Sequence, residues 1–147
     1  MTTTDKHRTP SDVYFFGTCI IDMFMPEAGM DAMTLLNKLG IKPHFPMAQS
    51  CCGQPAFSSG HRKEAFDVAK SQLELFPENW PIVVPSGSCG GMMKHHWPTL
   101  FKGSEYEARA NELAARVVEF TNFLVDIGYT PEDKGEPVKV AVHTSCS

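Results

Sequence analysis

Short apolar runs alternate with longer amphipathic segments along most of the chain. The runs are rich in β-branched and aromatic residues, which is typical of buried strands; they span residues 13–16, 41–45, 81–85 and 138–142. Between them, apolar residues recur at helical spacing, and the predicted helices span residues 26–39, 59–76 and 106–127. Pro26 suits a first helical turn, and Gly40 suits the end of the same helix.

This alternation predicts an α/β fold, a parallel sheet flanked by helices in a Rossmann-like three-layer arrangement. In such a sheet every strand-to-helix connection lies at the carboxyl edge of the strands, which is where open α/β folds bind ligands. Residues 1–12 are polar and are expected to form a disordered leader, so the predicted domain spans residues 13–147.

Cysteines follow the apolar runs. Cys19 comes after the first run, the adjacent pair Cys51 and Cys52 after the second, Cys89 after the third, and Cys146 after the fourth. The predicted topology brings Cys19, Cys51, Cys52 and Cys89 to one edge of the sheet, although they lie far apart in sequence. Two adjacent cysteines do not bond easily to each other, but both can reach one multi-metal centre. The pattern therefore favours a metal or iron–sulfur site over a disulfide framework.

Other interpretations of these residues remain open at the sequence level. Free cysteines are often buried as small apolar side chains, and four thiolates suit zinc as well as iron. The pair His95 and His96 is more typical of a helix surface than of a metal site.

The amino-acid composition and net charge exclude some classes of function. The chain has 147 residues, 42% of them hydrophobic, and a net charge of −4 without long charged runs. These values fit one globular domain and argue against binding to nucleic acid or to an anionic membrane surface. The sequence contains no apolar stretch long enough to cross a membrane, so no membrane insertion is expected. The expected location is the reducing cytoplasm.

The cysteine motifs resemble those of a known family. The segments Gly17-Thr18-Cys19, Cys51-Cys52-Gly53-Gln54-Pro55, Pro85-Ser86-Gly87-Ser88-Cys89 and His143-Thr144-Ser145-Cys146 resemble the cysteine-rich CCG domain. That domain occurs in iron–sulfur proteins of lactate utilisation, in the iron–sulfur subunit of glycolate oxidase and in heterodisulfide reductase.

The resemblance implies that Cys19, Cys51, Cys52 and Cys89 bind an iron–sulfur cluster, of the 4Fe-4S type. It also implies an oxidoreductase subunit that passes electrons to other subunits of a complex oxidising lactate or glycolate, and that is not catalytic alone. Two alternatives stand beside it: a thiol–disulfide oxidoreductase like heterodisulfide reductase, and a structural zinc domain.

The chain departs from the family pattern at two points. The full pattern ends in Cys-x-x-Cys, whereas Met92 stands at the last position, and a thioether is a poor substitute for a thiolate on iron. The family also carries a second copy of the domain, of which only Cys146 is present, so the chain is expected to be the first half of a longer protein. An apolar surface left uncovered by that absence predicts a homo-oligomer.

Overall fold

A parallel sheet of four short strands forms the centre of the molecule. The structure is a computed structural model that describes residues 9–142; part of the predicted leader, residues 1–8, and the predicted Cys146 motif, residues 143–147, lie outside the described residues. The strands stand in the order β2-β1-β3-β4 and all pairs are parallel; they are β1 (Asp12–Phe15), β2 (Lys42–His44), β3 (Ile82–Val84) and β4 (Val117–Glu119). The predicted α/β fold with a parallel sheet is therefore confirmed.

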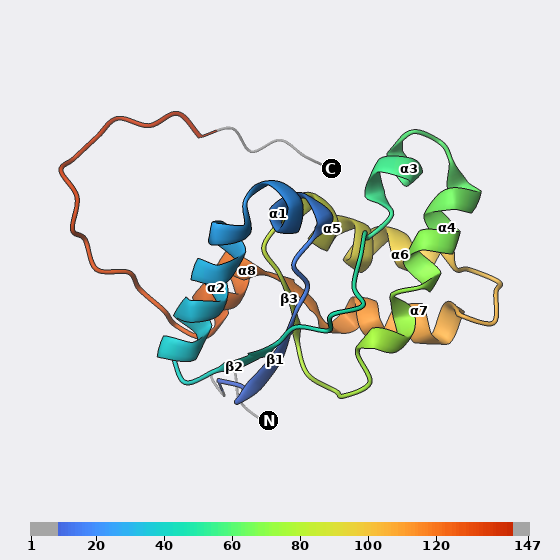
Figure 1. Cartoon of the computed structure of the whole chain (residues 1–147), viewed down its shortest axis with the longest axis horizontal. Coiled ribbons are helices and arrows are strands. Elements are labelled where there is room, and N and C mark those ends of the chain that lie inside the picture. Colours follow the sequence, from blue (N-terminus) through green and yellow to red (C-terminus); the bar gives the residue numbers. More distant parts are fainter. Residues whose placement is uncertain (1–8, 143–147) are drawn as a thin grey trace, which may run out of the picture.

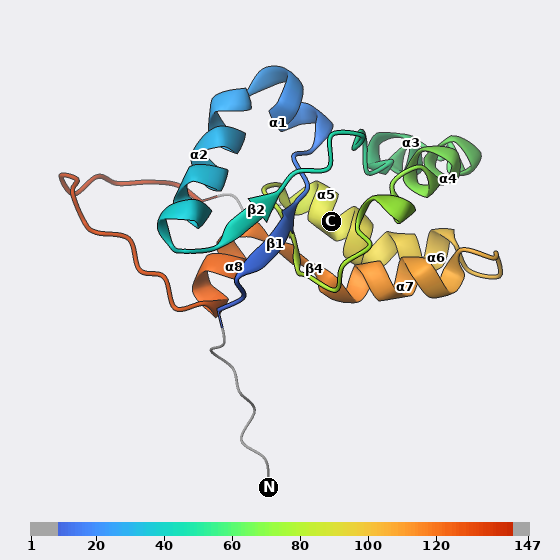
Figure 2. The same cartoon turned by 60° about the horizontal axis from the view of Figure 1, so that its bottom comes forward.

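Helices cover both faces of this sheet (Figure 1). Helices α2 (Pro26–Lys38) and α8 (Phe120–Asp126) pack on one face, and α4 (Arg62–Lys70), α6 (Trp97–Leu100) and α7 (Glu107–Arg116) lie on the other (Figure 2). The remaining helical segments are α1 (Cys19–Phe24), α3 (Gln54–Ser58), η1 (Leu73–Leu75), α5 (Gly87–Gly91) and the π-helical η2 (Met92–His96). None of the helices in residues 9–142 is long and apolar enough to span a membrane.

Alternation along β1 divides the core between the two faces. Val13 and Phe15 pack into a cluster with α2 and α8, whereas Tyr14 and Phe16 point into a larger cluster that contains Trp97. Successive strand residues point to opposite faces, so a strand covered on both sides needs apolar residues throughout. This requirement explains the uninterrupted apolar runs at β1 and β3.

The fourth strand is not where the sequence pattern predicted it. Residues 106–127, predicted as one helix, contain α7, then β4, then α8, and β4 pairs with β3 through Ile82↔Val117. The predicted strand 138–142 is wrong: these residues have no regular structure and lead away from the sheet, with Val140 75% exposed (Figure 1). Because β4 already occupies the position beside β3, the later valines have no partner in this sheet.

The predicted helix 59–76 is also interrupted. Its first residues form the turn after α3, and the rest is divided into α4 and η1; Gly60 in that turn adopts φ 84°. Left-handed backbone of this kind ends a helix, and glycine adopts it without a Cβ clash.

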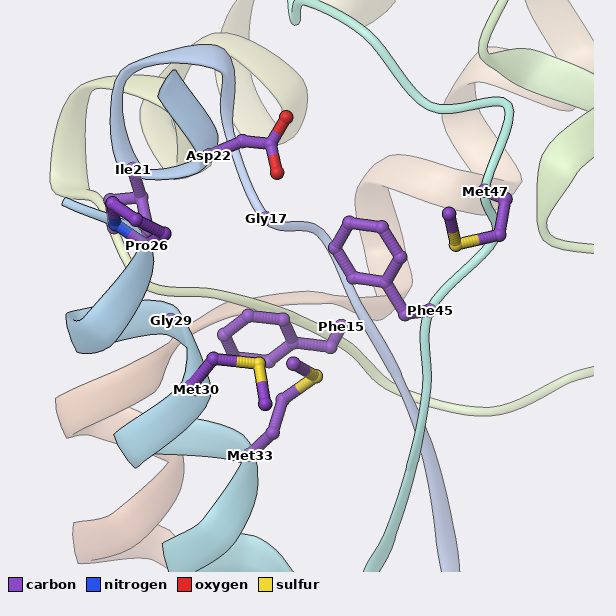
Figure 3. A pocket seen from close by; sticks show the side chains of 10 residues that line it. All are labelled: Phe15, Gly17, Ile21, Asp22, Pro26, Gly29, Met30, Met33, Phe45 and Met47. Atoms are coloured by element: carbon purple, nitrogen blue, oxygen red, sulfur yellow. The ribbon is translucent and has the colours of Figure 1, made fainter. Parts of the chain in front are cut away.

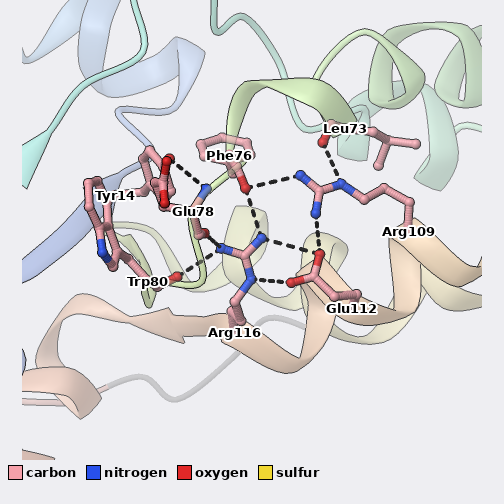
Figure 4. A network of polar contacts seen from close by, with 8 residues as sticks. All are labelled: Tyr14, Leu73, Phe76, Glu78, Trp80, Arg109, Glu112 and Arg116. Atoms are coloured by element: carbon pink, nitrogen blue, oxygen red, sulfur yellow. Dashed lines mark hydrogen bonds and ion pairs between the residues drawn. The ribbon is translucent and has the colours of Figure 1, made fainter.

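Two arginines of α7 hold the connection that leads into β3 (Figure 4). Arg116 donates to the carbonyl oxygens of Phe76 (2.9 Å) and Trp80 (3.0 Å), and its Nε lies 2.6 Å from a carboxylate oxygen of Glu112. Arg109 donates to the same Phe76 carbonyl at 3.0 Å. These charge-assisted hydrogen bonds satisfy carbonyls of a loop that lacks regular structure, and they fix the start of β3 against α7.

Candidate metal centre

The centre of the sheet is the place where a ligand site is expected. The chain runs from β1 outward to β2, then returns to the other side of β1 for β3, so the strand order reverses between β1 and β3. Open α/β folds bind ligands beside the carboxyl ends of the strands at such a switch point. Cys19 follows β1 and Cys89 follows β3, one on each side of this point.

Cys19 is presented by a tight turn directly after β1. Thr18 is buried and adopts a left-handed φ of 58°, and its hydroxyl accepts a hydrogen bond from the backbone N–H of Ile21 (3.3 Å). This N-cap starts α1 at Cys19 itself, so the thiol lies close to the strand end.

The first pair of thiols is formed by Cys19 and Cys51. Their sulfur atoms lie 3.7 Å apart, and both residues are partly exposed. The backbone N–H of Gly53 donates to the Cys51 sulfur at 3.4 Å. Backbone donors of this kind stabilise negative charge on a sulfur ligand.

The second pair, Cys52 and Cys89, is buried beneath the first. Both side chains are almost fully buried, and the indole N–H of Trp97 donates to the carbonyl oxygen of Cys52 at 3.0 Å. The hydroxyls of Ser86 and Ser88, just before Cys89 in the chain, lie 3.2 Å from each other. Helix α5 begins at Gly87, so Ser86 stands at the N-cap position.

The thiols influence one another electrostatically. Hydrogen bonding to Cys52, followed by the hydrogen bonds from Ser86 and Ser88, lowers the pKa of Cys89 to about 7. The same contact with Cys89, together with burial, raises the pKa of Cys52. Burial raises the pKa of Cys19, and the nearby sulfurs of Cys51 and Cys89 raise it further. The structure thus brings Cys19 to Cys51 and Cys52 to Cys89, whereas one site made of all four cysteines stays a prediction.

Gly53 completes the Cys-Cys-Gly turn for a steric reason. Its φ is 87°, and a Cβ at this position would lie 3.0 Å from the backbone oxygen of Ala65 in α4. Any other residue would strain the turn and push the loop away from α4, so the glycine allows Cys52 to be buried.

Two glutamines hold the cysteine loop, and the sequence pattern did not reveal them. The Gln49 amide accepts from the N–H of Gly17 and donates to the carbonyl of Phe15, both at 3.0 Å. The buried Gln72 accepts from the N–H of Ser50 at 2.9 Å and donates to its hydroxyl at 2.8 Å. Both side chains act as substitutes for backbone partners that an irregular loop lacks.

Three residues that follow Cys89, Met92, His95 and His96, are not grouped with the cysteines. Met92 is 1% exposed and packs in the core cluster with Trp97. His95 is exposed, and the His96 ring packs on Phe57 with centroids 4.7 Å apart. Within the described part of the chain, no group of three or more Cys, His, Asp or Glu side chains is arranged to hold a single metal ion.

Comparison with known proteins identifies the domain. The family model of the cysteine-rich domain, CCG, matches residues 13–94, a range that includes all four cysteines of the two pairs. The chain belongs to this family. The CCG assignment confirms the resemblance inferred from the motifs.

Two curated relatives share one name. Lactate utilization protein A of Geobacillus kaustophilus (strain HTA426) is 45% identical over 137 residues, which cover 91% of this chain and 56% of that protein. Lactate utilization protein A of Anoxybacillus flavithermus (strain DSM 21510 / WK1) is 44% identical over 138 residues, covering 92% of this chain and 57% of the relative. The chain therefore spans just over half the length of these relatives. No solved structure matches it significantly.

Proposed function

We propose that Cys19, Cys51, Cys52 and Cys89 hold an iron–sulfur cluster, and that this CCG domain is an electron-transfer unit. The observation that carries the proposal is the meeting of two thiol pairs at the switch point of the sheet, one pair partly exposed and the other buried. Iron–sulfur clusters are held by cysteine thiolates, so this donor set has the right chemistry.

The arrangement in two pairs favours a multi-iron cluster over a single zinc ion. In a tetrahedral zinc site with Zn–S bonds of 2.3 Å, all four sulfurs lie about 3.8 Å from one another. The separation of Cys19 and Cys51, 3.7 Å, fits one edge of such a tetrahedron, but no third donor among the described residues completes it. A cluster with several irons can bind thiolates that are farther apart than this, so it could take ligands from both pairs.

When bound, such a cluster accepts and donates single electrons at a potential that depends on hydrogen bonds to its sulfurs. The chain provides one such donor at the site, the N–H of Gly53 at Cys51, and the hydroxyls of Ser86 and Ser88 contribute to the lowered pKa of Cys89. Partial exposure of Cys19 and Cys51 leaves one side of the site accessible to a redox partner, and burial of Cys52 and Cys89 shields the other side from water.

The physiological process proposed for this unit is the oxidation of lactate to its 2-oxo acid in the cytoplasm, with glycolate as the alternative substrate. The name shared by the relatives supports the lactate assignment. In this scheme other subunits activate the hydroxy acid, and the domain transfers its electrons. The domain 13–147 is proposed to be the first of two cysteine-rich units, because the chain spans just over half the length of the relatives.

Anaerobic reconstitution with iron and sulfide tests the site. Cys51→Ser and Cys52→Ser should each sharply reduce bound iron and sulfide, since each removes one thiolate, while serine is similar in size and leaves the packing almost unchanged. Circular dichroism and thermal unfolding serve as fold controls. Full iron and sulfide content in both variants would place the site elsewhere. Turnover of a disulfide substrate by the reconstituted chain would instead support the thiol–disulfide oxidoreductase alternative.

A further inference from the structure

Helix α1 presents an unusual number of apolar side chains to solvent, next to the first thiol pair. This helix contains no buried residue, and Met23 and Phe24 are 70% and 71% exposed. We call the exposed group around it the methionine surface; it comprises Ile20, Met23, Phe24, Met25, Met30 and Met47. Contiguous exposed apolar residues of this kind mark interaction sites, and methionine is enriched where a surface must adapt to a partner.

An open cavity of about 350 Å³ lies beneath this surface (Figure 3). Met30 and Met33 of α2 line one side, Phe45 and Met47 from the segment after β2 line the other, and Phe15 forms its floor. Gly17 makes room for one wall, because a Cβ there would lie 2.7 Å from the Phe45 ring. The cavity offers a preformed apolar recess for a large apolar side chain.

The recess adjoins the thiols. A second cavity of about 290 Å³ is lined by Cys19 and Cys51, and it shares Gly17, Asp22 and Phe45 with the first. A molecule bound in the recess and on the methionine surface therefore lies directly beside the exposed thiol pair. Electron transfer to a partner requires such close approach.

The charged residues of α1, and those of α2 before Lys38, are all negative. Asp22, Glu27 and Asp31 are exposed on α1 and α2, and no lysine or arginine occurs between residues 9 and 37. Electrostatic complementarity favours a partner that carries basic residues. The same charges disfavour a second copy of this chain docked through the same face, because like charges would meet.

We propose that the methionine surface docks a partner protein that inserts a large apolar side chain into the recess and surrounds it with lysine or arginine residues. The assignment of this partner as the redox partner of the domain rests on the proposed function. A protein segment is the occupant favoured by the structure, because the exposed apolar residues of α1 extend well outside the cavity and a small molecule would leave them uncovered.

Methionine methyl NMR tests the docking, with two synthetic amphipathic helical peptides as probes: one of leucine and lysine, and the same peptide with glutamate replacing lysine. The lysine peptide should shift the methyl signals of Met23, Met30, Met33 and Met47 saturably. The buried Met92 and Met93 lie in the core cluster on the other face of the sheet and provide an internal control, because their signals should not move.

Two variants locate the interaction on this face. Phe24→Ser should weaken binding of the lysine peptide by roughly fivefold or more, as expected for an apolar residue at the centre of an interface. Glu27→Gln should weaken it less and reduce its salt dependence. The matched controls Val138→Ser and Glu64→Gln remove an exposed apolar and an exposed acidic residue outside the surface, and they should bind like the wild type.

Several results would overturn the proposal. One is equal binding of the lysine and glutamate peptides, and another is an equal loss of affinity in the control variants. A third is a shift of the methionine methyl signals with protein concentration in the absence of peptide, which would make a second copy of the chain the occupant. Iron and sulfide content is measured separately on the wild-type chain. A chain that binds the lysine peptide but no cluster would therefore refute only the proposed function.

Discussion

Gln72 provides the sharpest test of how the fold holds the cysteine loop. Its buried amide binds both the N–H and the hydroxyl of Ser50, the residue directly before Cys51 and Cys52. The substitution Gln72→Leu keeps the volume but removes both hydrogen bonds to Ser50, together with a local one to the Ser71 hydroxyl. Each contributes about 1 kcal/mol, and a backbone N–H left without a partner in a partly buried position adds to the loss.

The gain from burying an apolar side chain offsets part of this cost, so we expect the free energy of unfolding to fall by about 1–2 kcal/mol. For a chain of this length that corresponds to a decrease in Tm of roughly 3–8 °C. Urea unfolding of the reduced protein, monitored by tryptophan fluorescence, measures the change. Gln54→Leu is the matched control, because the Gln54 amide makes an exposed 3.4 Å contact with Ser58, and its cost should stay below about 0.5 kcal/mol.

The same variant should also bind less iron and sulfide, because the segment that carries two of the proposed ligands loses its anchor. If Gln72→Leu matched Gln54→Leu in both stability and iron content, the two hydrogen bonds would not hold the loop and the reasoning would be refuted.

Three further predictions concern the fold, the thiols and assembly. Arg116→Met should lower the free energy of unfolding by about 2–4 kcal/mol, because it removes several charge-assisted hydrogen bonds. The control Lys63→Met breaks an exposed ion pair and should lower it by less than about 0.5 kcal/mol. Similar losses for the two variants in urea unfolding would contradict this prediction. After aerobic purification we expect the chain to lack its cluster and to carry a disulfide between Cys19 and Cys51, the partly exposed pair, and peptide mapping that finds every thiol free would count against this. The isolated chain should self-associate through the exposed valines of residues 138–142, and light scattering should show Val140→Lys to be monomeric; a wild type that is monomeric at all concentrations would exclude it.

Much of the architecture could be predicted from the chain because burial on both faces leaves a clear signal. The runs at β1 and β3 are apolar without interruption, and Pro26 and Gly40 bracket α2 as expected. Strand β4 was missed because Val117 and Leu113 also fit a helical stripe, and three residues are too few to show strand alternation.

The cysteine site was predictable for a geometric reason: parallel strands place their following loops at one edge. The pairing of Cys19 with Cys51, and of Cys52 with Cys89, depends on the path of the loop and on tertiary contacts. Gln72 gives no local signal either, because its partner Ser50 lies 22 residues away in sequence.

The most direct test of the central proposal is the metal and sulfide content of the chain after anaerobic reconstitution. An iron–sulfur site of the 4Fe-4S type predicts iron and acid-labile sulfide in equal amounts, with a broad visible absorption that is lost in Cys89→Ser. A colourless protein that binds one equivalent of zinc and no sulfide would contradict the proposal and establish a structural zinc domain instead.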